Sequence, residues 1–255
     1  MVLNELINTI ESVAPLKWQE AWDNSGLQVG DRNADIDAAL LTTDVTESVV
    51  DEAIRLHCGL IVSHHPLLFF GLKNITGDTP QQRIVEKAIR NNIAIYSSHT
   101  AMDSYLHGVS GRIAEKIGLT DVKILNPVDE QHGLGVIGQL PEPVPFMDLL
   151  AHIKKTFQTT YIRYIAPLSV SVQTIALCGG AGAEFAEQAL QQGADVYITA
   201  DCKYHEFVDL NGRIGLIDID HWISEHFTRD IFRELLEKQI KTYISQEDKT
   251  PIKIF

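Results

Sequence analysis

The sequence predicts an α/β protein built from two structural repeats, each a mixed, mostly parallel sheet flanked by helices. Strand and helix patterns alternate along most of the chain with short connections, which is typical of parallel sheets covered by helices. Residues 51–63 align with residues 187–199 without a gap, so a helix-strand pattern recurs although few residues are identical. We place the boundary near residue 126, which gives a first repeat at 1–126 and a second at 127–255.

The first repeat opens with apolar residues at helical spacing, from Leu3 to Val13, and this helix must end before Pro15. Residues 18–30 read as a loop, whose two tryptophans could line a pocket but are expected to cover the core. Apolar runs and amphipathic patterns then predict alternating elements: strand 38–42, helix 47–56, strand 60–63, helix 81–90, strand 93–97 and helix 104–117.

The second repeat continues the alternation after a polar stretch around Asn126-Pro127. Its expected elements are strand 133–140, helix 146–157, strand 172–178, helix 183–192, strand 194–199, helix 203–210, strand 214–219 and helix 221–240. A loop over 246–251 should lead to a short terminal strand.

Composition narrows the class of partner. The chain has 255 residues, 45% of them hydrophobic and 22% charged, which fits an ordinary globular protein. Its formal charge of −13 argues against nucleic acid, because binding to phosphates depends largely on Lys and Arg. No leader-like or membrane-spanning apolar run occurs, so we expect a cytoplasmic protein with no membrane partner.

The cysteines and one glycine-rich segment are two further candidate motifs. Cys58, Cys178 and Cys202 form no C-x-x-C pair, so buried reduced thiols are expected rather than disulfides or a cysteine zinc site. Residues 179–182, Gly-Gly-Ala-Gly, could present backbone amides to a phosphate between a strand and a helix. They lack both the G-x-G-x-x-G spacing and a Walker lysine, so the glycines are expected to serve the geometry of a tight turn rather than phosphate binding.

Two adjacent histidines end the apolar run of residues 60–63. Pro66 has no N–H, so the strand should stop where His64 and His65 begin. Histidine is the commonest metal ligand, although one imidazole could instead cap the strand while the other faces solvent.

Both repeats place a histidine after a strand and a carboxylate four residues later. The pairs are His99 with Asp103 and His221 with Glu225. Residues four apart share one helix face, so imidazole and carboxylate could converge on one ion, although a single such pair could be a helix cap. The recurrence favours metal. His64, His65, Asp103, His221 and Glu225 exceed the three protein ligands usual at one catalytic zinc, which suggests two ions.

The ordered motifs resemble one family over the whole chain. They are residues 20–30 (EAWDNSGLQVG), 63–66 (SHHP), 98–103 (SHTAMD), 178–182 (CGGAG), 203–205 (KYH) and the late His221-x-x-x-Glu225. This set is similar to that of the Nif-three-like family, often described as type 2 GTP cyclohydrolase I homologues. The resemblance implies two intertwined α/β repeats with a dinuclear metal site between them, commonly in a toroidal homohexamer. Longer members carry an inserted domain, for which this chain has no room.

Residue by residue, the resemblance implies that the five side chains above are the metal ligands, with Glu225 as the bridge. His99 would sit beside the site and His205 could face it, and either could shuttle a proton as a catalytic residue. Asp220 stands where the family usually has glycine, which adds a nearby negative charge.

The expected function is a dinuclear metal-dependent hydrolase that acts through a metal-activated hydroxide, on GTP or a related nucleotide. The alternative is a non-catalytic, metal-binding regulatory or interaction protein. Imidazole and carboxylate ligands suit zinc, iron, manganese, nickel or cobalt, so the identity of the two divalent ions and the physiological substrate stay open.

Overall fold

A computed structural model describes residues 1–129 and 131–254, which form a mixed α/β fold with two mixed sheets. The chain divides into two compact units. Unit 1 comprises Met1–Met102 together with the segment that begins at Thr228, and unit 2 comprises Asp103–Phe227. Within the described residues, no helix has the length and apolar character that crossing a membrane requires.

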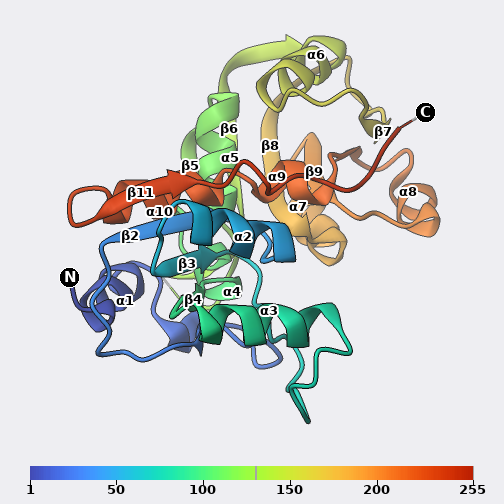
Figure 1. Cartoon of the computed structure of the whole chain (residues 1–255). Helices are drawn as coiled ribbons and strands as arrows, with labels where there is room; N and C mark the ends of the chain where they lie inside the picture. The colour runs from blue at the N-terminus through green and yellow to red at the C-terminus, as the bar shows by residue number, and fades with distance from the viewer. Residues whose placement is uncertain (130, 255) are drawn as a thin grey trace. The chain divides into compact units, whose positions relative to one another are not determined.

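The sheet of unit 1 has the strand order β1-β4-β3-β2-β11 (Figure 1). Its strands are β1 (Gly26–Val29), β2 (Ala38–Thr42), β3 (Leu60–Ser63), β4 (Ala94–Ser97) and β11 (Lys241–Ile244). The four strands from β4 to β11 run parallel, and only β1 is antiparallel to its neighbour. The buried central strands are continuous apolar runs because both faces of the sheet are covered.

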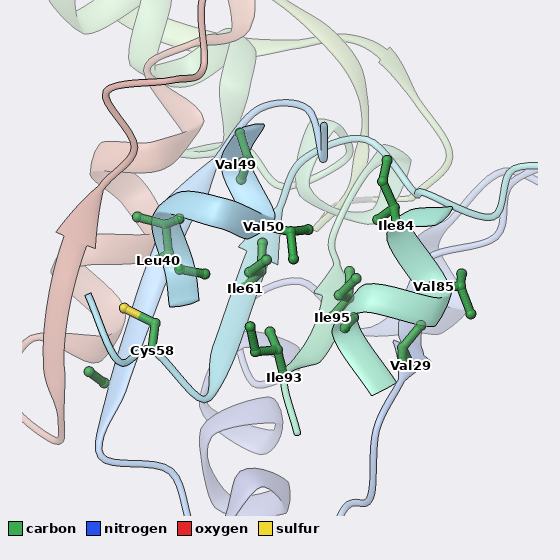
Figure 2. Packing of buried hydrophobic residues seen from close by; sticks show 13 residues of the cluster. Val29, Leu40, Val49, Val50, Cys58, Ile61, Ile84, Val85, Ile93 and Ile95 are labelled. Atoms are coloured by element: carbon green, nitrogen blue, oxygen red, sulfur yellow. The ribbon is translucent and has the colours of Figure 1, made fainter. Parts of the chain in front are cut away.

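One face of this sheet packs on α2 (Glu47–Arg55) and α3 (Pro80–Arg90) (Figure 1). Figure 2 shows side chains of that face, such as Leu40, Ile61 and Ile95, directed at apolar side chains of the two helices. Thr46 and Thr79 cap the N-termini of α2 and α3 by accepting backbone hydrogen bonds, which fixes where each helix begins.

The opposite face packs on α1 (Leu3–Glu11) and α10 (Thr228–Leu236). Tyr96 is fully buried on that side of β4, and its hydroxyl donates to Glu11 of α1 over 3.2 Å. Because side chains alternate along a strand, Tyr96 points away from the face that carries Ile95. Unit 1 therefore has a helix layer on each face of its sheet.

The sheet of unit 2 has the order β5-β6-β8-β9-β10-β7. Parallel pairing is confined to β8, β9 and β10. The strands are β5 (Thr120–Pro127), β6 (Gly133–Pro145), β7 (Arg163–Ile165), β8 (Ser171–Ala181), β9 (Val196–Ala200) and β10 (Gly215–Asp218). An apolar core of β8, β9 and β10 side chains packs on the helical segment after β8, around Phe185, Ala186 and Ala189.

Of the helices of unit 2, α5 precedes β5, and the others lie between or after the strands. They are α5 (Val109–Ile117), α6 (Phe146–Thr156), α7 (Ala186–Gln191), α8 (Tyr204–Leu210) and α9 (His221–Glu225), while the short α4 (Thr100–Asp103) spans the change from unit 1 to unit 2. Two 3-10 turns, η1 (Leu16–Trp18) and η2 (Ala183–Phe185), complete the set in the described chain.

The internal repeat is visible in the strand orders. Unit 1 contains β1-β4-β3-β2 and unit 2 contains β7-β10-β9-β8, so corresponding strands occupy corresponding places. The elements that follow these four strands belong to the other unit in each case. After β4, the elements α5, β5 and β6 belong to unit 2, and after β10, the elements α10 and β11 belong to unit 1. Unit 1 thus takes elements from both ends of the chain, whereas unit 2 is one continuous segment.

Several elements differ from the sequence-based expectation. The region 18–30 contains β1, and β5, β7 and β11 are additional strands. The helix expected over 221–240 is two helices, because the chain turns at His226 and Phe227, whose rings contact each other with centroids 3.9 Å apart. No strand forms over residues 251–254, so the expected terminal strand is wrong for the part described.

Candidate metal centre

The histidines of unit 1 gather where β3 and β4 end. His64 and His65 follow β3, and His99 follows β4. These two strands run parallel with Ser63 opposite Ser97, so the three imidazoles leave the sheet at one edge. One nitrogen from each of the three rings lies within 4.8 Å of the others, which is close enough for a shared metal ion.

Each of these rings is held through Nδ1. His65 Nδ1 lies 2.9 Å from Asp44 Oδ1, and His64 Nδ1 lies 3.1 Å from the Ser98 carbonyl oxygen. His99 Nδ1 lies 2.9 Å from Asp23 Oδ1. Metal-binding histidines typically use one nitrogen for such an outer partner and the other for the metal. The arrangement therefore fits ligation through Nε2.

Asp23 is the most firmly placed of these outer carboxylates. Its side chain is fully buried and accepts hydrogen bonds from the Thr100 hydroxyl (2.6 Å) and from the Ser25 hydroxyl (2.8 Å). Burial by itself disfavours the charged form, but the hydrogen bonds to His99, Thr100 and Ser25 outweigh it and hold the pKa of Asp23 well below its usual range. Asp23 is therefore ionised, and it fixes the orientation of His99.

Unit 2 carries a second group on α9. His221 Nε2 lies 3.0 Å from Glu225 Oε2, because residues four apart share one face of the helix. The other ring nitrogen of His221 lies 2.7 Å from Asp201 Oδ2. Asp201 directly follows β9 and adopts a left-handed backbone conformation with φ 56°. Imidazole and carboxylate donors within 3.0 Å of each other could both reach one ion.

Residues 179–182 make room for Glu225 rather than for a phosphate. A Cβ on Gly180 would lie 2.1 Å from Glu225 Oε1, and φ is +65° there. The amide of Gly180 donates to Ser224 Oγ (2.8 Å), and that of Gly179 donates to Ser110 Oγ (3.2 Å). Gly179 and Gly180 also lie within β8, not in a strand-to-helix turn. These two amides are therefore committed inside the protein, and the glycines serve close packing.

Asp103 and Asp220 also have defined places in unit 2. Burial raises the pKa of the Cys178 thiol, and the negative charges of Asp103 and Glu225 add to the effect. Both carboxylates thus act on one buried position of the unit. Asp220 is the N-cap of α9 and accepts a hydrogen bond from the Ile223 amide (3.2 Å), which gives its carboxylate a helix-capping role.

His205 lies apart from the contacts described so far. It is exposed on α8, and its ring packs edge-on against Tyr204 with centroids 5.4 Å apart. Trp22 also differs from expectation, because 58% of its surface is exposed and it does not cover the core. Trp22 instead contacts the His99 ring, at a centroid separation of 5.9 Å.

A cavity of about 500 Å³ in unit 1 opens beside His65. Its lining includes Asp44, which orients His65, and the first residues of α2 and α3. Ligand pockets usually have volumes of about 300–1,000 Å³, so a small molecule would fit next to this histidine.

Sequence reasoning missed the outer carboxylates Asp23, Asp44 and Asp201. Their partners are 76, 21 and 20 residues away along the chain, so no local spacing links them. A usable signal exists for two of them. Asp44 follows β2 and Asp201 follows β9, and each is thus an acidic residue at the edge of the sheet where the neighbouring strand delivers a histidine.

The fold and these side chains define an α/β protein with two mixed sheets whose histidine and glutamate groups could hold a metal ion. The chain belongs to the family described as Duf34/NIF3 (NGG1p interacting factor 3), whose model matches residues 1–251. It is 36% identical to the GTP cyclohydrolase 1 type 2 homolog of Clostridium perfringens, covering 98% of each chain. The Lactococcus lactis protein of the same name is 33% identical, again over 98% of each chain.

A solved structure supports the same assignment. The Bacillus cereus protein related to NIF3 superposes with a TM-score of 0.90 at 25% identity, over 99% of each chain. The expected family resemblance and the expected α/β fold are both confirmed by these comparisons.

Proposed function

We propose that this protein is a dinuclear metal-dependent hydrolase that acts on GTP or a related nucleotide. Its metal ligands would be His64, His65, Asp103, His221 and Glu225. The observation that carries the proposal is the outer partner on each histidine: His64, His65 and His221 all have Nδ1 held by an oxygen. Outer partners of this kind orient metal ligands and raise their basicity.

Two divalent ions in such a site would polarise a substrate oxygen and lower the pKa of a bound water towards neutrality. The chain's own residues would do the rest. His99, which is held by Asp23 and grouped with His64 and His65, would take a proton from the reacting water, and a fixed ring orientation favours that transfer. His205 of unit 2 would be a second residue that transfers a proton, and its exposed position permits this role.

The nucleotide part of the proposal comes from the relatives, two of which bear the name GTP cyclohydrolase 1 type 2 homolog. The cavity beside His65 supports it, because its volume of about 500 Å³ suits a molecule of that size. By the same family argument, we propose that the protein assembles as a homo-oligomer, a hexamer, which light scattering on the purified chain would test.

The first test measures metal. Calorimetric titration of apoprotein with Zn²⁺ and with Mn²⁺ should give two ions per chain for the wild type and a weakened site for His64→Ala and for Glu225→Gln. His152, which is exposed on α6, provides the matched control, and His152→Ala should bind as the wild type does. Equal stoichiometry and affinity in all four proteins would refute the ligand assignment.

The second test measures turnover. Metal-loaded protein is offered GTP, phosphodiesters and phosphomonoesters, and hydrolysis of at least one class that His64→Ala abolishes would support the enzyme. The family description names an interacting factor, so the competing function is a metal-binding interaction protein. Metal binding without any turnover, with partner binding lost in His64→Ala, would decide for that alternative.

A further inference from the structure

We propose that Trp22, Phe69 and Phe70 form an aromatic platform that binds the planar heteroaromatic ring of the substrate beside the histidines of unit 1. The inference rests on the proposed function and adds to it the feature by which the substrate is held. Large aromatic side chains are usually buried well, yet these three are 58%, 39% and 81% exposed. A group of exposed aromatic rings normally marks a binding surface.

The platform is continuous with the histidine cluster. Trp22 and Phe69 lie with ring centroids 5.8 Å apart, and Phe70 meets Phe69 edge-on at 5.0 Å. Both Trp22 and Phe69 also contact His99, at 5.9 and 6.5 Å between ring centroids. A ring resting on Trp22 or Phe69 would therefore lie next to the imidazoles that the proposed function uses.

The platform is built on a braced backbone. Asn24 donates its side-chain amide to the Leu68 carbonyl (2.6 Å), and the Leu68 amide donates to Gln28 Oε1 (3.1 Å). Gln28 in turn donates to the Asn24 carbonyl (2.7 Å), which closes a ring of hydrogen bonds between the two loops. Asp23, next to Trp22, is buried and fixed. Trp22 is thus exposed in a rigid loop, which lowers the entropic cost of binding a ligand.

The chemistry of this surface suits a neutral planar ring. Its apolar part comes from three aromatic rings, while the carboxylate of Asp23, the residue that follows Trp22, disfavours an anion directly on the platform. Stacking of a nucleobase on an aromatic side chain contributes about 1–3 kcal/mol by alanine substitution and tolerates different bases. The substrate class is therefore a compound with a planar heteroaromatic ring, and the ring itself should supply part of the affinity.

The test compares two probes that share a sugar phosphate and differ in the ring, namely guanosine 5′-monophosphate and ribose 5-phosphate. Calorimetry on the full, Zn²⁺-loaded chain should show the nucleotide binding about 5- to 150-fold more tightly, which corresponds to about 1–3 kcal/mol. Trp22→Ala should abolish the difference and Trp22→Phe should keep most of it. Leu168→Ala, which removes an even more exposed apolar side chain of unit 2, should leave it unchanged.

Three results would overturn the inference. Equal affinity of the wild type for both probes would exclude ring recognition, and equal behaviour of Trp22→Leu and Trp22→Phe would show apolar burial rather than stacking. A change of oligomeric state in Trp22→Ala, with the ring preference intact, would assign the platform to contacts between copies. Zn²⁺ stoichiometry is measured on every variant. If the wild type binds no Zn²⁺, the proposed function is refuted. If it binds Zn²⁺ but shows no ring preference, only the platform is refuted.

Discussion

The close contact between Gly180 and Glu225 makes Gly180→Ala a demanding test of the proposed metal-binding pair His221 and Glu225. The new Cβ would lie 2.1 Å from Glu225 Oε1 in a backbone with φ +65°. A left-handed conformation costs a non-glycine residue about 1–2 kcal/mol. Overpacking of a well-filled site costs about 1–3 kcal/mol more. We therefore expect the free energy of unfolding to fall by about 2–5 kcal/mol, as measured by urea denaturation.

Gly193 is the matched control, because its φ is +78° and nothing lies within 4 Å of a Cβ built there. Gly193→Ala should lose only the backbone part, about 1–2 kcal/mol. Since relief of the clash must move the Glu225 carboxylate, Gly180→Ala should also weaken Zn²⁺ binding by about tenfold or more, whereas Gly193→Ala should not. Equal stability and equal Zn²⁺ affinity in the two variants would refute this account of Gly180.

Asp201, the three cysteines and Asp248 each allow a further test. Asp201→Asn should weaken Zn²⁺ binding by about 10–100-fold in calorimetry, because Asp201 orients His221, and unchanged affinity would exclude that role. All three cysteines are buried, and burial raises the pKa of Cys58 to about 11 and that of Cys202 to about 12, so a thiol reagent at neutral pH should label none in native protein and all three after denaturation. Buried Asp248 accepts hydrogen bonds from the Thr43 amide (2.7 Å) and from the partly buried Arg229 (3.2 Å). Asp248→Ala should lower the free energy of unfolding by about 3–5 kcal/mol, while Lys249→Ala, at an exposed neighbour, should have little effect, and equal losses would count against the buried pair.

The strands that the sequence predicted well are those buried on both faces. Ala38–Thr42 and Leu60–Ser63 are continuous apolar runs bounded by polar turns, and the structure begins and ends them at the expected residues. The missed strands lack that signal. In β5 most residues are exposed or half-buried, and β11 has no fully buried residue, so neither presents an apolar run. Their pairing partners, rather than their own composition, make them strands.

The candidate site likewise has residues that the sequence predicts and residues that it does not. His64, His65, His99, His221 and Glu225 stand at strand ends or on one helix face, where spacing alone places them. The groups that orient them could not be predicted, because contacts such as Asp23 with His99 join loops distant in the chain. The exposure of Trp22 could not be predicted from the sequence either, since a tryptophan in a loop more often covers a core than faces solvent.

The exchange of terminal elements between the repeats has a consequence for biosynthesis. Unit 2 is one continuous segment, Asp103–Phe227, whereas the sheet of unit 1 needs β11, whose residues are translated after all of unit 2. Domains fold as units while the chain emerges at about 5–20 residues per second. Unit 2 can therefore mature first, and the strands of unit 1, although made earliest, must wait on the ribosome with the β2 edge unpaired until Lys241–Ile244 arrives. A premature stop before that strand would release a chain whose β2 edge has unpaired backbone groups and can pair with other chains. Nascent-chain quality control should therefore act most strongly on such truncations.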